Sequence, residues 1–139
     1  MLTKSAVIAE LDRQLLRKLS YLNTSLKQAI DSRNSDTKSS AGDKFETSRE
    51  MAQIEIHKIE NEILKTQQFI SDLHSKGTKF INTDKGTFLI SIPFGKLMVS
   101  GTEVFCISKT APITSPLINT KVSANFDYRG VAYNVLDIT

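Results

Sequence analysis

Two long segments of the chain repeat apolar residues every three or four positions, which is the spacing of an amphipathic helix. The first segment runs from about Ser5 to Asp31, and the second runs from Ala52 to the region of Lys76-Gly77. The apolar positions of the first are Ile8, Leu11, Leu15, Leu19, Leu22, Leu26 and Ala29. Those of the second are Ala52, Ile56, Ile59, Ile63, Thr66, Ile70 and Leu73. Each series predicts a helix with one narrow apolar seam, as in a coiled coil.

The segment between the two helices, residues 32–42, is polar and rich in Ser, Asn and Asp. These side chains compete with helical hydrogen bonding, so we expect a polar loop here, with partial helix at either end still compatible with the sequence. Helices of similar length joined by such a loop are expected to pair as an antiparallel hairpin, because local pairing costs little loop-closure entropy. At 1.5 Å per residue, about 30 residues give a rod of roughly 45 Å. The alternative is that each seam pairs with a second molecule in a dimeric coiled coil.

From Thr78 onward the apolar residues alternate with a period of two, which is typical of strands. We predict strands near 79–83, 87–92, 96–100, 103–108, 123–128 and 131–138. A short helix is expected over 113–119, after Pro112. The predicted fold class is therefore α+β, with a helical hairpin over residues 1–76 and a small antiparallel β domain over residues 77–139.

Charge narrows the class of partner. The net charge is +3, and 12 of the 18 Lys and Arg residues lie before Gly77 among 11 acidic residues. This mixed surface lacks the dense basic stripe of an autonomous nucleic-acid-binding protein. A protein partner, which could itself carry nucleic acid, is the better prediction.

The sequence indicates a soluble, cytoplasmic protein. Cys106 is the only cysteine, which rules out an internal disulfide and favours a reducing compartment. We expect Cys106 to be a small core residue. The first residues carry charge too early for a secretory signal, and no apolar run approaches the roughly 20 residues of a membrane span. No nucleophile elbow, phosphate-binding loop, Cys-x-x-Cys or dinucleotide fingerprint occurs, so we do not expect a self-sufficient enzyme.

The segment Gly42–Thr47, with the sequence Gly-Asp-Lys-Phe-Glu-Thr, lies where the hairpin is expected to turn. Asp43 and Glu46 fit a capping box at the start of the second helix. Carboxylates three residues apart also share one helix face and can contact one hard cation, so capping and metal binding are compatible. His57 and His74 lack metal-ligand spacing, and we expect both on the surface.

A helical hairpin with Gly-Asp-x-x-Glu between its helices, followed by a small β-rich domain, resembles the bacterial Gre transcript-cleavage factors. Gly42, Asp43 and Glu46 match the family motif, whereas Thr47 and Arg49-Glu50 depart from it. Further matches in the β domain are Ile107-Ser108, Ala111-Pro112-Ile113, Leu117-Ile118, Lys121 and the final strand Tyr133-Asn134-Val135-Leu136-Asp137-Ile138. The family's Gly-Asp after the small helix is replaced by Ser123-Ala124.

The resemblance implies a mode of action. A domain that is FKBP-like in fold, without isomerase activity, docks on the rim of RNA polymerase, and the hairpin enters the secondary channel. Asp43 and Glu46 then help to hold an Mg²⁺ shared with the polymerase, which cuts the 3′ end of backtracked nascent RNA. The free protein is expected to be monomeric and to bind no metal by itself. The expected docking surface is the loop formed by Lys109, Thr110, Ala111, Pro112 and Ile113.

Two other functions fit the sequence. One is a regulator that occupies the polymerase channel without stimulating cleavage, which the departures at Thr47, Arg49 and Glu50 keep open. The other is a coiled-coil scaffold protein whose β domain binds something unrelated. Two carboxylates alone make a poor Mg²⁺ site, because the ion retains waters or takes phosphate oxygens as further ligands. If the protein is a transcript-cleavage factor, catalysis therefore requires the polymerase.

Overall fold

A computed structural model describes residues 2–39 and 43–139, with side chains described for residues 2–35 and 47–139. The chain divides into two compact units. The hairpin unit contains Gln14–Ile70, and the sheet unit contains Met1–Arg13 together with Ser71–Thr139. Both long helices cross the boundary between these units. Within the described ranges, no helix is long and apolar enough to cross a membrane.

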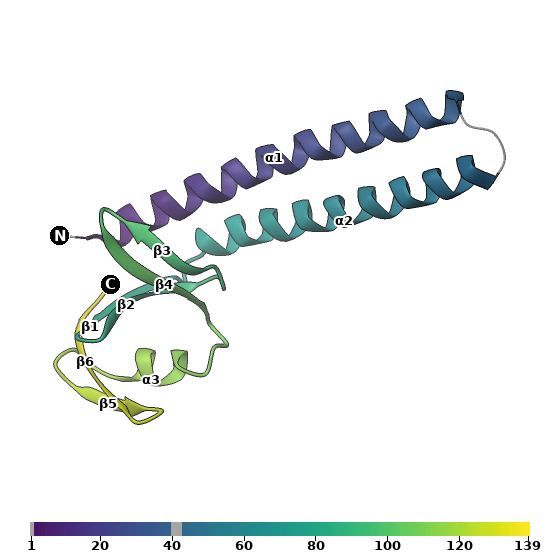
Figure 1. The fold of residues 1–139 in the computed structure, drawn as a ribbon. Coiled ribbons are helices and arrows are strands. Elements are labelled where there is room, and N and C mark those ends of the chain that lie inside the picture. The colour runs from purple at the N-terminus through teal and green to yellow at the C-terminus, as the bar shows by residue number, and fades with distance from the viewer. Residues whose placement is uncertain (1, 40–42) are drawn as a thin grey trace. The chain divides into compact units, whose positions relative to one another are not determined.

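The hairpin unit is formed by the packed helices α1 (Lys4–Ser39) and α2 (Asp43–Leu73), which run along each other in opposite directions (Figure 1). The predicted seam is confirmed in this unit. Its buried members are Leu15, Leu22, Ile56, Ile59 and Thr66. Two polar contacts join the helices: Lys18 Nζ lies 3.5 Å from Glu62 Oε2, and Arg33 Nη1 donates to Gln53 Oε1 at 2.9 Å. The amphipathic patterns therefore meet in one antiparallel pair.

The loop predicted over residues 32–42 is largely wrong, because α1 continues to Ser39. The low helix propensity of Ser, Asn and Asp is only a weak preference, and tertiary packing routinely overrides it. Here α2 already begins at Asp43, so the last turns of α1 have a neighbouring helix alongside them. The hydrogen bond from Arg33 to Gln53 is a contact of this kind.

The sheet unit contains six strands in the order β3-β4-β2-β1-β6-β5. Their bounds are β1 Lys79–Thr83, β2 Gly86–Ser91, β3 Gly95–Val99, β4 Thr102–Ser108, β5 Asn125–Tyr128 and β6 Val131–Ile138. Every predicted strand is present, with ends shifted by at most two residues. One part of the expectation needs correction: β2 and β4 pair in parallel, with Leu89 opposite Cys106, whereas all other pairs are antiparallel. Alternation with a period of two is the same in both kinds of ladder, so the sequence pattern does not distinguish them.

One face of the sheet packs against the short helix α3 (Thr114–Asn119), which lies within the predicted range (Figure 1). The core cluster on this face comprises Ile81, Phe88, Ile90, Leu117 and Val135. Because successive side chains of a strand point to opposite faces, Leu89 and Cys106 lie on the other face, and both are buried. Cys106 is therefore a core residue, as predicted. The sheet unit also buries Val7 and Leu11 of α1 and Leu73 of α2.

Candidate functional site

The segment Gly42–Thr47, called the tip motif below, falls where the described structure stops and resumes. Helix α2 begins at Asp43, so Asp43 and Glu46 occupy its first turn. A capping box has its Asp at the residue before the first helical residue, so this helix start lies one residue earlier than that interpretation expects. Gly42 and the side chains of Asp43 and Glu46 lie outside the described residues. Their roles as cap, metal ligand or catalytic group stay predictions.

The next residues of α2 are described and are open to solvent. Thr47, Arg49 and Glu50 are all exposed. Among the described residues, no group of three or more His, Cys, Asp or Glu side chains could hold a metal ion. The donor set that the tip offers is a pair of hard carboxylate oxygens, which suits Mg²⁺ only where other molecules complete the coordination.

A series of contacts between polar side chains follows along the hairpin unit. Arg33 donates to Gln53 Oε1, and Gln53 Nε2 lies 3.2 Å from His57 Nε2. His57 Nδ1 is 3.5 Å from Glu60 Oε1. His57 is exposed, as predicted for a surface histidine.

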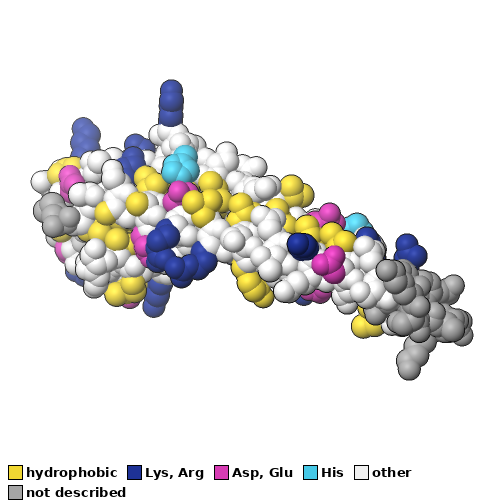
Figure 2. Space-filling model, turned by 90° about the horizontal axis from the view of Figure 1, so that it is seen from above, with side chains coloured by type: hydrophobic (Ala, Val, Ile, Leu, Met, Phe, Trp, Pro, Cys, Tyr) yellow, Lys and Arg dark blue, Asp and Glu magenta, His cyan; other side chains and the backbone are white. Residues whose placement is uncertain are grey.

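On the face of the molecule shown in Figure 2, cationic and anionic side chains are interspersed and form no single basic stripe.

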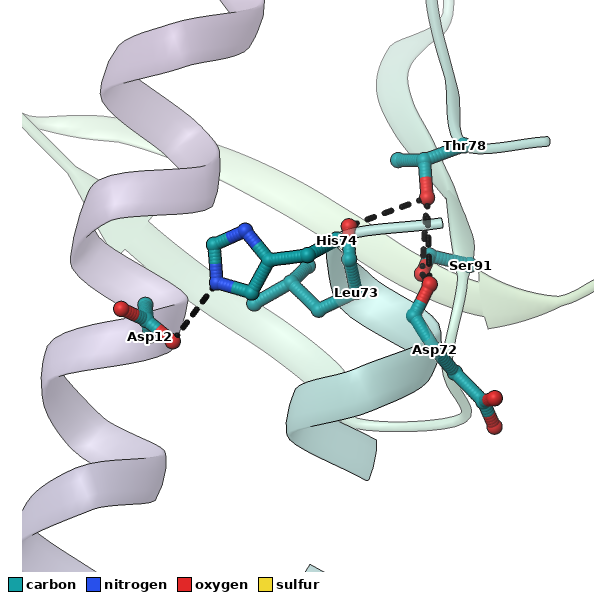
Figure 3. A network of polar contacts seen from close by, with 6 residues as sticks. All are labelled: Asp12, Asp72, Leu73, His74, Thr78 and Ser91. Carbon is teal, nitrogen blue, oxygen red and sulfur yellow. Dashed lines mark hydrogen bonds and ion pairs between the residues drawn. The ribbon is translucent and has the colours of Figure 1, made fainter. Parts of the chain in front are cut away.

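The end of α2 is joined to strand β2 by hydroxyl groups (Figure 3). Thr78 Oγ1 lies 3.1 Å from Leu73 O and 3.2 Å from Ser91 Oγ, and Ser91 Oγ donates to Asp72 O at 3.2 Å. Thr78 is almost completely buried. These bonds satisfy carbonyl groups at the helix C-terminus, which have no partner within the helix. The network therefore attaches the helix end to the sheet.

The same end of α2 contacts α1 through a hydrogen bond. His74 Nε2 lies 3.0 Å from Asp12 Oδ1, and both residues belong to the sheet unit. Figure 3 shows the imidazole ring pointing from the end of α2 toward the carboxylate on α1. His74 is exposed, as predicted. The sequence gives no sign of this contact, because residues 12 and 74 are far apart in the chain.

The loop expected to dock on polymerase is a closed turn. Thr114 Oγ1 donates to Ser108 O at 2.7 Å, and the Thr114 amide donates to Ala111 O at 2.9 Å. Pro112 is exposed, whereas Ile113 is half-buried and packs against the core cluster under α3. Ile113 therefore contributes to the core as well as to the loop surface. A charge placed at Ile113 would lower stability, so such a variant cannot isolate docking.

Lys109, the first residue of this loop, lies over Gly77. A Cβ atom built at Gly77 would come within 2.4 Å of Lys109 Nζ and 3.0 Å of Lys109 Cε. Both atoms belong to the flexible end of a lysine side chain, which can move. Lys109 and Thr110 are exposed, and Ala111 is half-buried. The loop thus exposes Lys109, Thr110 and Pro112 to solvent.

The sheet unit also contains a recess that was not predicted from the sequence, next to the turn between β3 and β4. A cavity of about 410 Å³ is lined by Ala6, Ala9, Glu10 and Arg13 of α1 and by Met98, Val99 and Ser100. A second cavity of about 300 Å³ shares Ala6 and Ser100 with it and adds Leu2 and Thr102. The only sequence signal is the pair of small residues Ala6 and Ala9 outside the apolar seam. Such residues are too common in helices to mark a site.

No protein-family model, curated protein or solved structure matches this chain in comparisons with known proteins.

Proposed function

We propose that this protein is a transcription elongation factor that binds RNA polymerase and stimulates cleavage of backtracked RNA. The helical hairpin enters the secondary channel, and the sheet unit docks on the polymerase rim. Asp43 and Glu46 reach the polymerase active centre from the end of the hairpin. The nuclease is the polymerase itself, and the factor supplies part of a metal site.

The observation that carries this proposal is the place of the tip motif in the fold. The two long helices are connected by residues 40–42, and Asp43 is the first residue of α2. The two carboxylates therefore belong to the first turn after the connection, where a hairpin can present them to a partner. A small β sheet with one short helix follows, which is the order of parts that the family resemblance implies.

The chemistry assigned to the tip is the binding of a hard cation. When bound, Mg²⁺ would activate water and neutralise charge on the phosphate that is cut. Asp43 and Glu46 would each contribute a carboxylate oxygen, and the polymerase and the RNA would contribute the remaining ligands. Without that cation, the two carboxylates would repel the RNA phosphates.

The proposal is tested with Asp43→Asn and Glu46→Gln. Both changes keep side-chain size but remove the negative charge that an Mg²⁺ ligand needs, so we expect a loss of cleavage rate on the order of 100-fold. Asparagine is a good helix cap, so Asp43→Asn should leave stability nearly unchanged. The assay is Mg²⁺-dependent release of short 3′ fragments from backtracked complexes with purified polymerase.

Glu55→Gln is the matched control, because it removes one exposed carboxylate of α2 that lies outside the tip motif. It should cleave at close to the wild-type rate. Cleavage that survives both tip substitutions would show that Asp43 and Glu46 act only as a cap. If the wild-type protein does not bind polymerase, the proposal is wrong and the scaffold function is favoured.

A second candidate is a channel-occupying regulator that does not stimulate cleavage. It is favoured by the exposed Thr47, Arg49 and Glu50, which replace the residues that follow the acidic pair in the family motif. Wild-type protein that binds polymerase but gives no cleavage at any Mg²⁺ concentration would support this candidate.

Docking by the 109–113 loop is tested separately with Pro112→Asp. Pro112 is exposed, so the new charge should leave the fold intact and weaken polymerase binding. Asn125→Asp on the exposed edge strand β5 adds the same charge away from the loop and serves as the control. Equal affinities of the two folded variants would place the docking surface elsewhere.

A further inference from the structure

The recess beside the β3–β4 turn lies along a free edge of the sheet. Strand β3 is the first strand in the sheet order, so only β4 pairs with it within the described residues. The two cavities that share Ala6 and Ser100 border the end of this strand. Their other wall is formed by Leu2 and by residues of α1, namely Ala6, Ala9, Glu10 and Arg13. An edge strand next to an open recess leaves space for a further extended segment.

The register determines which backbone groups of β3 face away from β4. Val99 pairs with Thr102 across the two-residue turn Ser100-Gly101, whose φ angles of 49° and 80° are typical of a type I′ hairpin. In such a hairpin the closing pair is hydrogen-bonded, and hydrogen-bonded and non-hydrogen-bonded pairs then alternate. The amide and carbonyl groups of Met98 and Lys96 therefore point outward along the free edge.

The charges around the recess favour an uncharged ligand. Arg13 donates from Nε to Glu10 Oε2 at 2.9 Å and from Nη2 to Glu10 Oε1 at 2.6 Å. Lys96 Nζ lies 3.9 Å from Glu103 Oε1 on the adjacent strand. Each cation thus lies beside an anion, which does not favour a phosphate or a nucleic-acid strand. These paired side chains can still donate hydrogen bonds to the carbonyl groups of a peptide and accept hydrogen bonds from its N–H groups.

Met98 adds an apolar contact at the same edge. Its side chain is 58% exposed although it belongs to a strand, and the residue borders the larger cavity. Methionine is flexible and adapts to different apolar side chains. The edge therefore offers backbone hydrogen bonds together with one adaptable apolar surface, which is the combination that strand addition uses.

We propose that the recess between β3 and the start of α1 binds an extended peptide segment of a partner protein, which adds to β3 as a seventh strand. Main-chain hydrogen bonds to Lys96 and Met98 provide the affinity, and contacts with Met98 and the recess provide the selectivity. This binding surface is distinct from the tip and from the 109–113 loop, and it requires no metal.

The test uses the full chain and a display library of short random peptides selected on the wild-type protein. Enriched peptides are synthesised, and their affinities are measured for wild type, Met98→Pro and Ala9→Leu. Proline removes the outward amide of residue 98, which does not bond to β4, so β3 can still pair with β4. Leucine at the exposed Ala9 fills the recess without altering the sheet. Both variants should lose at least about tenfold in affinity.

Gln28→Leu is the matched control, because it places leucine at another exposed position of α1 that lies in the hairpin unit. It should bind the peptides as wild type does. In wild type, hydrogen exchange at the Lys96 and Met98 amides should slow when the peptide binds. This readout does not depend on whether either variant folds.

Three outcomes would overturn the proposal: no enriched peptide, equal binding by Met98→Pro, or unchanged exchange at Lys96 and Met98. Slower exchange at these amides without peptide, in a protein that light scattering shows to be dimeric, would assign the edge to a second copy of the chain. None of these measurements involves polymerase, so their failure is separate from a failure of the proposed function.

Discussion

Asp84 joins the β1–β2 turn to strand β6 through both its side chain and its backbone. Its Oδ1 accepts from the Asn134 amide at 2.7 Å, and its own amide donates to Asn134 O at 3.1 Å. The bond from Asn134 lowers the pKa of the Asp84 carboxyl, and the Lys85 ammonium 3.1 Å away lowers it further. The ionised carboxylate is therefore favoured in the folded state.

This contact predicts a pH-dependent contribution of Asp84 to stability. Because the pKa is lower in the folded state, the stabilisation is present at neutral pH, above the unfolded pKa of about 3.9. It is lost as the pH falls through the lower folded pKa. Thermal unfolding should show Asp84→Ala to be less stable than wild type at pH 7, with the difference shrinking below about pH 4.

Asp127→Ala, which removes an exposed carboxylate on β5, provides the comparison for Asp84→Ala. It controls for the loss of an exposed carboxylate elsewhere in the sheet unit. A constant difference between Asp84→Ala and wild type at all pH values would show that the hydrogen bond does not depend on ionisation.

Cys106 should be unreactive in the folded protein. It is 1% exposed, and burial raises the pKa of its thiol from 9.0 to about 11. The thiolate is the reactive species, so the fraction available near pH 8 falls on the order of 100-fold from this shift. Labelling with a chromogenic disulfide reagent should be slow in buffer and complete in guanidinium chloride. Rapid labelling of native protein would contradict a buried Cys106.

At the scale of the secondary-structure elements, replacing each of two buried threonines with valine is expected to have different effects on stability. Thr66 occupies a seam position of α2, and its Oγ1 donates to Glu62 O at 2.8 Å within the same helix. The backbone amide of residue 66 can satisfy that carbonyl, so the hydroxyl adds little. Thr66→Val should leave stability unchanged or raise it by up to about 1 kcal/mol, because the seam becomes fully apolar.

Thr78→Val is the matched change at the junction of α2 with the sheet. It removes the hydroxyl that lies near Leu73 O and Ser91 Oγ, and it leaves buried polar groups without that partner. We expect a loss of about 1–2 kcal/mol in the free energy of unfolding, measured by urea denaturation. A stabilising Thr78→Val or a strongly destabilising Thr66→Val would contradict these assignments.

The helices and strands also show which parts of the fold could be predicted from sequence patterns. Seam residues such as Leu15 and Ile56 were predicted because burial in a helix pair requires apolar groups every three or four positions. The strands were predicted because turn residues such as Gly101 and Gly130 separate short alternating runs. The extent of the helical continuation to Ser39, which covers most of the expected loop, was not predicted, since it depends on a neighbouring helix and not on local propensity.

At the scale of the whole molecule, the proposed insertion into a channel makes the length of the hairpin important. Because Lys18 lies opposite Glu62, the heptad Leu15–Tyr21 lies opposite residues near Ile59–Lys65. Deleting both heptads would shorten the hairpin by roughly 10 Å and keep the seam in register. The shortened protein should stay helical by circular dichroism and bind polymerase, but it should lose cleavage stimulation.

Deleting only Leu15–Tyr21 is the control, because it changes one helix and breaks the pairing register. This variant should lose helix stability as well as activity. Full cleavage activity in a well-folded protein with the double deletion would argue against insertion of the hairpin into a channel.

The sequence by itself determined the α+β class, the antiparallel helix pair and the positions of the strands. These follow from the periods of apolar residues, which reflect local geometry and the need to bury one face. Only the tertiary structure decided that β2 and β4 run parallel, that Ile113 is a core contact and that Asp12 meets His74. It also decided that β3 ends the sheet beside a recess. Each of these features joins residues distant in the chain, and a periodic pattern carries no information about which distant segments become neighbours.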